Sequence, residues 1–240
     1  MNTHIALGKL LGLFLSVLGI FCVMPEVSAQ SVNGTQQLLN RGFEDYDNLG
    51  SKSVEPVGWN SFMTAKTAGG IVDQGKDQRL ERVGDVRPGT AGQYSVRIYS
   101  TSILGINANG TITTGRLNMG SATATDPSNH SFTERGAEGF YFPFTVVPDS
   151  MVIWAKYAPN SASDQGQVNA IIHGDNEIWD PGTDKNLAVA IALINPTKQN
   201  GGWVRYSAPF DRSGCGSKDA RYILVSITTN KQPGGGAAQL

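Results

Sequence analysis

Cysteine is almost absent from this chain of 240 residues, which contains only Cys22 and Cys215. Two cysteines exclude a disulfide scaffold and a cysteine-based metal cluster. A nucleophilic cysteine also needs an activating histidine. The two histidines after the apolar N-terminal segment, His130 and His173, lie in unrelated sequence contexts. The sequence therefore predicts that Cys215 is a loop thiol, or one half of a disulfide to residues outside this chain.

An excess of charge of either sign is also missing. The chain has 19 Lys and Arg residues against 20 Asp and Glu residues, a formal net charge of −1. Such a balance gives no electrostatic attraction toward phosphate backbones or anionic lipid surfaces. We therefore expect no nucleic-acid partner.

Long apolar runs are limited to one, from Leu10 to Val23, with Lys9 before it. The polar segment that follows ends in Val27-Ser28-Ala29, a small-x-small pattern typical of a cleavable secretory signal. The run is shorter than the roughly 20 apolar residues that a transmembrane helix needs, which disfavours the alternative of a membrane anchor. We expect residues 1–29 to be removed. Residues 30–240 would then form one exported domain without a membrane span, outside the cell, on its surface or in the periplasm.

Helical periodicity is missing as well, because no segment of helix length repeats its apolar residues every 3.6 positions. Glycine (29 residues) and proline (11 residues) instead separate short β-forming runs at fairly even intervals, a pattern typical of a β-sandwich. Asn109-Gly110 lies between two such runs and predicts a tight hairpin. The expected strands are 93–100, 103–108, 111–114, 151–157, 167–173, 187–194, 203–210 and 221–229.

The end of the chain is unusual, because a glycine run at 234–236 is followed only by residues 237–240. A jelly roll generally pairs its last strand with its first, and glycine-rich connections normally lead to another element. We therefore expect that the chain lacks its final strand. Either further domains of the same polypeptide follow, or the sheet keeps an exposed edge, which favours aggregation.

Several sequence blocks occur in an order that resembles one known family. The blocks are Asn40-Arg41-Gly42-Phe43-Glu44, Pro56-Val57-Gly58-Trp59, Arg87–Gly92, Asn109–Arg116, Trp154-x-Lys156-Tyr157-x-Pro159, and Trp203 with Pro209-Phe210. Together they resemble the bacterial putative carbohydrate-metabolism domain family of secreted and surface proteins. The resemblance implies an all-β fold, a jelly-roll β-sandwich of two antiparallel sheets that begins with the Asn40–Glu44 strand. It also implies an origin in bacteria that feed on complex glycans, and it supplies no catalytic motif.

Glu44 is the candidate metal ligand. In many carbohydrate-binding sandwiches, a carboxylate at this position helps to hold a structural calcium ion, together with backbone carbonyls and an aspartate of the final strand. Calcium takes six to eight oxygen ligands, so Glu44 alone cannot form the site. Asp45 and Asp47 are nearby, but alternation along a strand sends neighbouring side chains to opposite faces. The alternative is a solvent-facing acid at a strand end, and the sequence indicates no other cofactor.

The densest polar cluster is the 173–184 segment, which combines four acids, a histidine and Trp179. This mixture suits a sugar site, since an indole face stacks on a pyranose and carboxylates accept hydrogen bonds from hydroxyls. Trp179, Asp175 and Glu177 are the candidate sugar ligands. Glycosidases need two carboxylates, about 5–5.5 Å apart for retention or about 6.5–9.5 Å for inversion, and Glu177 with Asp180 is the candidate pair. The alternative is an ordinary polar loop.

Trp59 and Arg116 complete the candidate sugar ligands. Trp59 follows a glycine near a turn, so it can belong to the core or face a ligand. The fork of Arg116 can hold a carboxylate bidentately, either from a uronic acid or internally from Glu134 or Glu138. Trp154 alternates with apolar residues of its strand and is expected in the core.

These features favour an exported module that binds a polysaccharide or glycoconjugate glycan by aromatic stacking and polar loop contacts. A glycoside hydrolase with paired carboxylates is the first alternative, and a structural or adhesin sandwich without a sugar site is the second. No acid pair stands out in the sequence, which favours binding over cleavage.

Overall fold

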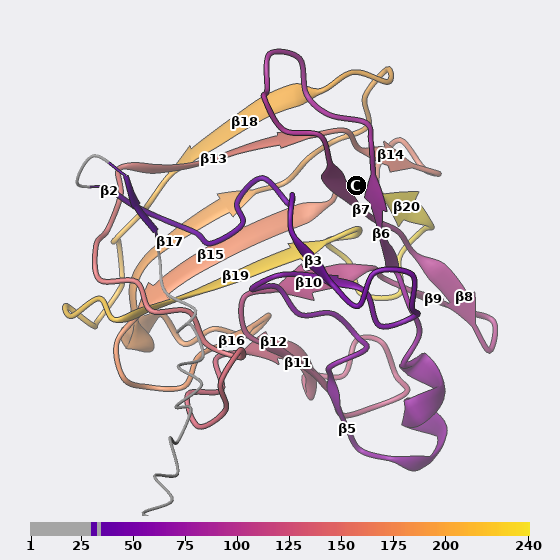
Figure 1. Cartoon of the computed structure of the whole chain (residues 1–240). Coiled ribbons are helices and arrows are strands. Elements are labelled where there is room, and N and C mark those ends of the chain that lie inside the picture. Colours follow the sequence, from indigo (N-terminus) through magenta and orange to yellow (C-terminus); the bar gives the residue numbers. More distant parts are fainter. Residues whose placement is uncertain (1–29, 33–34) are drawn as a thin grey trace, which may run out of the picture.

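The computed structural model describes residues 30–32 and 35–240 (Figure 1). The expected secretory signal, residues 1–29, lies outside the described residues. Apart from two short 3₁₀ helices, every regular element of the described part is a β-strand, which confirms the all-β fold. None of the helices found in this part is long and apolar enough to cross a membrane.

The centre of the domain is a four-stranded antiparallel sheet. Its order is β10 (Thr111–Thr113), β19 (Tyr222–Thr228), β15 (Gln167–His173) and β17 (Ala188–Ile194). The sequence pattern locates all four strands to within one or two residues. The three strands β15, β17 and β19 are rich in Ile, Val and Ala because the central sheet is covered on both faces.

One face of the central sheet forms the main core. Val168, Ala170 and Ile172 of β15 pack there against partly buried side chains of β13 (Ser150–Ala155) and β18 (Val204–Pro209). Strands β13 and β18 pair with each other in antiparallel fashion. Burial of this apolar surface is the main driving force for the fold.

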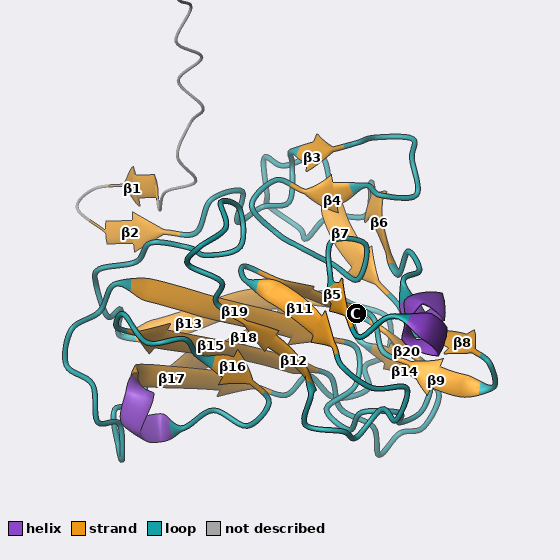
Figure 2. Cartoon of the chain, turned by 90° about the horizontal axis from the view of Figure 1, so that it is seen from below, coloured by secondary structure: helices purple, strands orange, loops and turns teal. Residues whose placement is uncertain are grey.

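The opposite face of the central sheet packs against a second sheet. Its strands are β16 (Trp179–Asp180), β12 (Asn129–Phe132), β11 (Arg116–Met119) and β5 (Lys66–Thr67), in this order, with β5 parallel to β11. In Figure 1 these strands lie below the central sheet, and β13 and β18 lie above it. Figure 2, seen from below, shows β11, β12 and β16 in front. The stacked sheets agree with the expected β-sandwich, although the strands are divided among more than two sheets.

Short antiparallel pairs and two 3₁₀ helices complete the domain. They are β1 (Gln30–Val32) with β2 (Thr35–Gln37), β3 (Tyr46–Asp47) with β4 (Glu55–Pro56), β6 (Leu80–Val83) with β7 (Ser95–Ile98), β8 (Thr101–Ile103) with β9 (Ile106–Ala108), β14 (Ala158–Pro159) with β20 (Ala238–Gln239), η1 (Gly70–Gly75) and η2 (Lys185–Leu187).

The hairpin predicted at Asn109-Gly110 is wrong. The tight turn lies at Leu104-Gly105, where φ is 51° and 79°, and it joins β8 to β9. Two consecutive positive φ angles are what a tight hairpin turn requires. Gly110 has a different reason to be glycine: a Cβ there would come within 2.6 Å of the Tyr99 carbonyl oxygen. Strand β10, after Gly110, pairs with β19 instead of β9.

The Asn40–Glu44 block is not the first strand. It forms a turn with positive φ at Asn40 and Phe43. The Asn40 side chain holds this turn, because its Nδ2 donates to the Asp45 carbonyl (2.8 Å) and its Oδ1 accepts from the Glu44 amide (2.9 Å). Side-chain bonds of this kind favour turns over strands.

Two further details differ from the sequence-based expectation. The glycine run at 234–236 leads into β20, which pairs with β14 instead of a first strand. Trp154 is 39% exposed on β13, and Val152 beside it is 44% exposed. The residues of β13 that face the core are therefore Met151 and Ile153, and Trp154 points to the opposite side.

Candidate functional site

The polar 173–184 segment does not form one site, because its side chains point in different directions. His173 is fully buried. Asp175 is exposed and its carboxylate pairs with Arg221 at 3.1 Å and with Arg135 at 3.7 Å. Glu177 is also exposed and does not line the cavity that Asp180, three residues later, borders.

Strand β16 separates Trp179 from Asp180, since successive residues of a strand point to opposite faces. Trp179 pairs with Phe132 of β12 and is 40% exposed on the outer face of the second sheet. Asp180 lies between the two sheets, where its Oδ1 accepts a hydrogen bond of 2.7 Å from Asn169 Nδ2 of β15. Two neighbouring residues thus reach two different surfaces.

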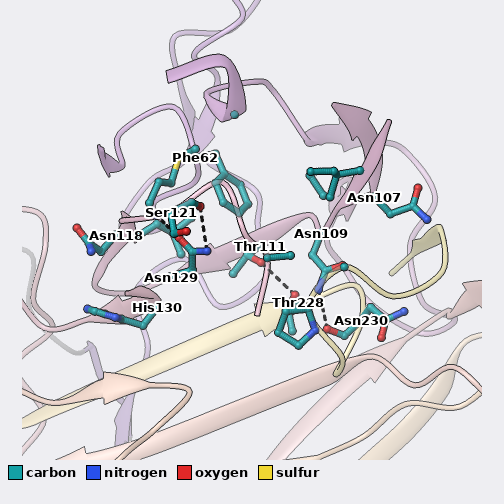
Figure 3. A pocket seen from close by; sticks show the side chains of 18 of the residues that line it. Phe62, Asn107, Asn109, Thr111, Asn118, Ser121, Asn129, His130, Thr228 and Asn230 are labelled. Carbon is teal, nitrogen blue, oxygen red and sulfur yellow. Dashed lines mark hydrogen bonds between the residues drawn. The ribbon is translucent and has the colours of Figure 1, made fainter. Parts of the chain in front are cut away.

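Asp180 borders a cavity of about 280 Å³ between the central and second sheets. The β8–β9 hairpin, η1 and the 230–234 segment form its remaining walls. Figure 3 shows Asn118, Ser121, Asn129 and His130 on one side of this space and Asn107, Asn109, Thr228 and Asn230 on the other. The cavity is thus built by segments that are far apart in the sequence.

Apolar side chains, among them Phe62, Leu117 and Met119, make up most of the cavity lining. The wall formed by the central sheet is polar, because the inner face of that sheet changes from apolar to polar along its strands. At one end of this face the residues are apolar: Ile171 of β15 and Leu224 of β19 are fully buried and belong to a second, smaller core cluster. At the other end of the same face, where the strands border the cavity, the residues are polar: Gln167 of β15, Ser226 and Thr228 of β19, and Thr111 of β10. A polar residue at every second position of a buried strand is the sequence signal that could have revealed this cavity.

The amides around the cavity have two different roles. Asn129 is saturated, because it holds the 121–123 turn through three bonds to the backbone of Ser121 and Thr123. Asn109 has a free acceptor, since its Nδ2 donates to the Asn230 carbonyl (2.8 Å) and its buried Oδ1 has no partner. The buried hydroxyl of Ser226 has no hydrogen-bond partner within 3.5 Å, but it lies close enough to the Asp180 carboxyl group to lower its pKa. Buried polar atoms without partners carry a desolvation cost, which a hydroxyl-bearing ligand would offset.

The cavity wall has few acidic groups. Asp180 is the one carboxylate among the residues that line it, and burial raises the pKa of this carboxyl group against the opposing effects of the Asn169 amide and the Ser226 hydroxyl. Arg79, His130 and Lys231 also line the space. The cavity therefore has more basic than acidic groups.

The outer face of the second sheet carries a row of aromatic side chains. His130 lies between Phe132 and Trp179, with ring centres 5.8 Å and 6.2 Å away. Lys66 lies over the Phe132 ring at 5.3 Å. His130 is at the same time a residue of the cavity wall, so the cavity and the aromatic row border one another.

Two of the residues expected to bind sugar make their contacts within the protein instead. Trp59 is 4% exposed and packs in the main core against Phe43, so its indole face is not free for stacking. Arg116 pairs with Glu134 at 2.9 Å and lies over the Phe140 ring at 4.3 Å. The internal pairing of Arg116 that the sequence left open is thus the one that forms.

Glu44 is held by backbone amides. Its Oε2 accepts from the amides of Gln93 (2.9 Å) and Tyr94 (3.3 Å). Within residues 30–32 and 35–240, no three His, Cys, Asp or Glu side chains are grouped in a way that could hold a metal ion. The carboxylate here fixes the 90–94 loop to the turn that contains Asn40.

Comparison with known proteins yields structures and no sequence relatives. No family model matches the chain, and no curated protein matches it. A putative glycoside hydrolase from Bacteroides thetaiotaomicron is similar with a TM-score of 0.58 and 18% identity, over 83% of this chain and 67% of that one. The two share a fold. A putative glycoside hydrolase from Bacteroides vulgatus has a TM-score of 0.49 and 12% identity, over 81% of this chain and 86% of that one.

Proposed function

We propose that this domain binds a glycan in the cavity between its two sheets. The observation that carries the proposal is the lining of that cavity, where the amide and hydroxyl side chains of Asn109, Ser226 and Thr228 stand among apolar side chains. Sugar hydroxyls both donate and accept hydrogen bonds, so they match such a lining. The shared fold with a protein described as a glycoside hydrolase supports a carbohydrate-related role.

The aromatic row extends the proposed site beyond the cavity. A glycan that leaves the cavity past His130 reaches Trp179, whose indole is exposed and lies 6.2 Å from the His130 ring. Indole and pyranose faces stack because both are broad and apolar, with polar groups at their edges. The ligand is therefore an oligosaccharide or polysaccharide and not a single sugar.

Binding is favoured over cleavage because the cavity has a single carboxylate. Glycoside hydrolysis by the usual mechanisms needs two carboxyl groups across the scissile bond. Asp180 alone lines the cavity, and Glu177 lies on the exposed side of the loop. Asp180 has the raised pKa of a general acid, which keeps hydrolysis as the alternative to be tested.

The test combines retention and release. The chain from residue 30 is incubated with a panel of plant and host polysaccharides, and both the bound protein and newly formed reducing ends are followed over time. Retention without release is the expected result. Failure to retain any polysaccharide would contradict the proposed function, and steady release would replace binding by hydrolysis.

Replacing Asp180 with asparagine separates the two activities. The variant keeps the shape of the side chain and can still accept the hydrogen bond from Asn169. For a binding module we expect the affinity to change by only a few-fold, since one hydrogen bond is worth about 1 kcal/mol. A wild-type protein that releases reducing ends, together with an Asp180→Asn protein that does not, would identify Asp180 as a catalytic acid.

Removing the Trp179 indole should weaken binding of long glycans. We expect Trp179→Ala to lower the affinity by about 10-fold, corresponding to ~1.5 kcal/mol of lost stacking, with a smaller effect on a monosaccharide. Trp154→Ala is the matched control, because Trp154 is 39% exposed but lies on β13, at the other side of the central sheet. Equal effects of the two substitutions, measured by titration calorimetry, would remove the aromatic row from the site.

The proposal includes export of the domain. It is supported by the signal-like composition of residues 1–29. Fractionation of cells that produce the full chain, compared with a chain that starts at residue 30, tests it. Retention of the full chain in the cytoplasm would exclude it.

A further inference from the structure

Arg79 is a buried cation in the wall of the cavity. The residue is 4% exposed, and its guanidinium lies 3.6 Å from the centre of the Phe62 ring. Nη1 donates to the Asn109 carbonyl at 2.7 Å and Nη2 donates to the Gly75 carbonyl. Nε is buried without any hydrogen-bond partner. The group is thus positioned rigidly, but its donors are not all used.

The charge of Arg79 has no counter-ion within the described residues. The six ion pairs found there do not include Arg79. Asp77, two residues earlier, is exposed and acts on it only at a longer distance. Burial lowers the pKa of Arg79 to about 10, so the guanidinium is still charged at neutral pH. A buried charge without a partner is costly, and an anionic ligand would remove that cost.

The remaining groups of the cavity agree with an anionic ligand. Lys231 is exposed in the wall of the cavity and belongs to none of the six ion pairs. Asp180 is the only acid among the lining residues. It lies on β16 of the second sheet, whereas Arg79 precedes β6 and is in contact with the β9–β10 connection.

We propose that the cavity binds an acidic unit of the glycan, and that Arg79 pairs with its oxyanion. The anion is the carboxylate of a uronic acid or the sulfate of a sulfated sugar, since both present oxygens that a guanidinium can bind in pairs. This inference rests on the proposed function, because it names the class of glycan that the same cavity takes. Asn109, Ser226 and the outer aromatic row then bind the hydroxyls and faces of the sugar rings.

The decisive experiment uses the wild-type chain and matched ligands. Trigalacturonic acid is compared with its methyl ester, which has the same rings without the charges, and a sulfated oligosaccharide is compared with its desulfated form. We expect at least one charged ligand to bind 10-fold or more tightly than its neutral partner, and the difference to shrink as salt is raised. The pair that shows the preference tells carboxylate from sulfate.

The outcomes distinguish this inference from the proposed function. Equal or tighter binding of the neutral partners in both pairs overturns the acidic ligand and leaves glycan binding intact. Retention of neutral polysaccharides alone would likewise overturn the acidic ligand and leave glycan binding intact. Absence of binding to every glycan overturns both proposals.

Variants of Arg79 then test its role. In Arg79→Met the charge is lost at similar length, and the preference for the charged ligand should disappear. In Arg79→Lys the charge remains without the planar fork, and an intermediate preference is expected. Arg205→Met, an exposed position on β18, is the matched control. An unchanged preference in folded Arg79→Met would exclude Arg79 as the partner of the anion.

Discussion

Glycan binding should be lost when Thr111 is replaced with tryptophan. Thr111 is in the edge strand β10, half-buried, with its hydroxyl 3.0 Å from that of Thr228 on the inner face of the sheet. An indole at this position extends into the space of about 280 Å³ that the sugar would occupy. We expect the affinity to fall by at least ~100-fold, which corresponds to about 2.8 kcal/mol. Titration calorimetry with a retained polysaccharide measures the loss.

The control for this variant places the same bulk elsewhere. Ser207 is exposed on β18 and pairs with Val152, so Ser207→Trp adds an indole to a strand position that faces solvent. Ser207→Trp should bind like the wild type. Urea unfolding checks that Thr111→Trp is folded, because overpacking costs about 1–3 kcal/mol when a site cannot take the added volume. A folded Thr111→Trp protein that binds with wild-type affinity would place the glycan outside the cavity.

The second large effect is a loss of stability in acid that depends on His173. This residue is 0% exposed, with its Nε2 2.9 Å from the Thr133 hydroxyl and its Nδ1 2.9 Å from the Gly174 carbonyl. A carbonyl oxygen only accepts, so Nδ1 carries the proton and Nε2 accepts from Thr133. Burial is the main reason that the pKa of His173 falls to about 4, although its backbone hydrogen bonds act in the opposite direction.

A lowered histidine pKa destabilises the fold as the pH decreases. Between pH 6.5 and pH 4 the unfolded chain binds a proton at His173 that the folded chain does not, so the free energy of unfolding falls with pH. With a folded pKa of about 4, this residue accounts for a loss of about 3 kcal/mol across that interval. Above pH 6.5 His173 is neutral in both the folded and the unfolded chain, so no stability is lost there.

The measurement compares the wild type with His173→Gln by urea unfolding from pH 7 to pH 4. Glutamine does not titrate and can accept a hydrogen bond from Thr133. The wild-type advantage over the variant should therefore shrink by about 3 kcal/mol as the pH falls. Carboxyl groups, including Asp180 and Glu55 with their raised pKa values, titrate in both proteins, so their effects cancel in the difference. Parallel pH profiles would show that His173 is protonated in the folded state or does not limit stability in acid.

The strands were readable from the sequence where local chemistry determines them. The runs at 167–173, 187–194 and 221–229 are rich in residues with high β-propensity, and they form β15, β17 and β19. Turns were less readable. Both Leu104-Gly105 and Asn109-Gly110 can form a tight turn, and the choice between them depends on the pairing of β10 with the distant strand β19.

The candidate site was only partly readable for the same reason. The composition of 173–184 drew attention to Trp179 and Asp180, and both border the proposed site. Arg79 was missed, because a single arginine between two short β-forming runs carries no pattern. Its proposed role rests on its burial beside Phe62 and Asn109 without a paired carboxylate.

The sequence by itself determined the all-β class, because alternating apolar residues and frequent glycine and proline act over a few neighbouring positions. It also indicated which segment is rich in sugar-binding residue types. Only the tertiary structure decided that Trp59 is in the core and that Asp180 faces the cavity while Trp179 faces outward. The reason is that a cavity is made by side chains from β10, β12, β15, β16 and β19 together, and the register between these strands depends on the packing of the whole domain.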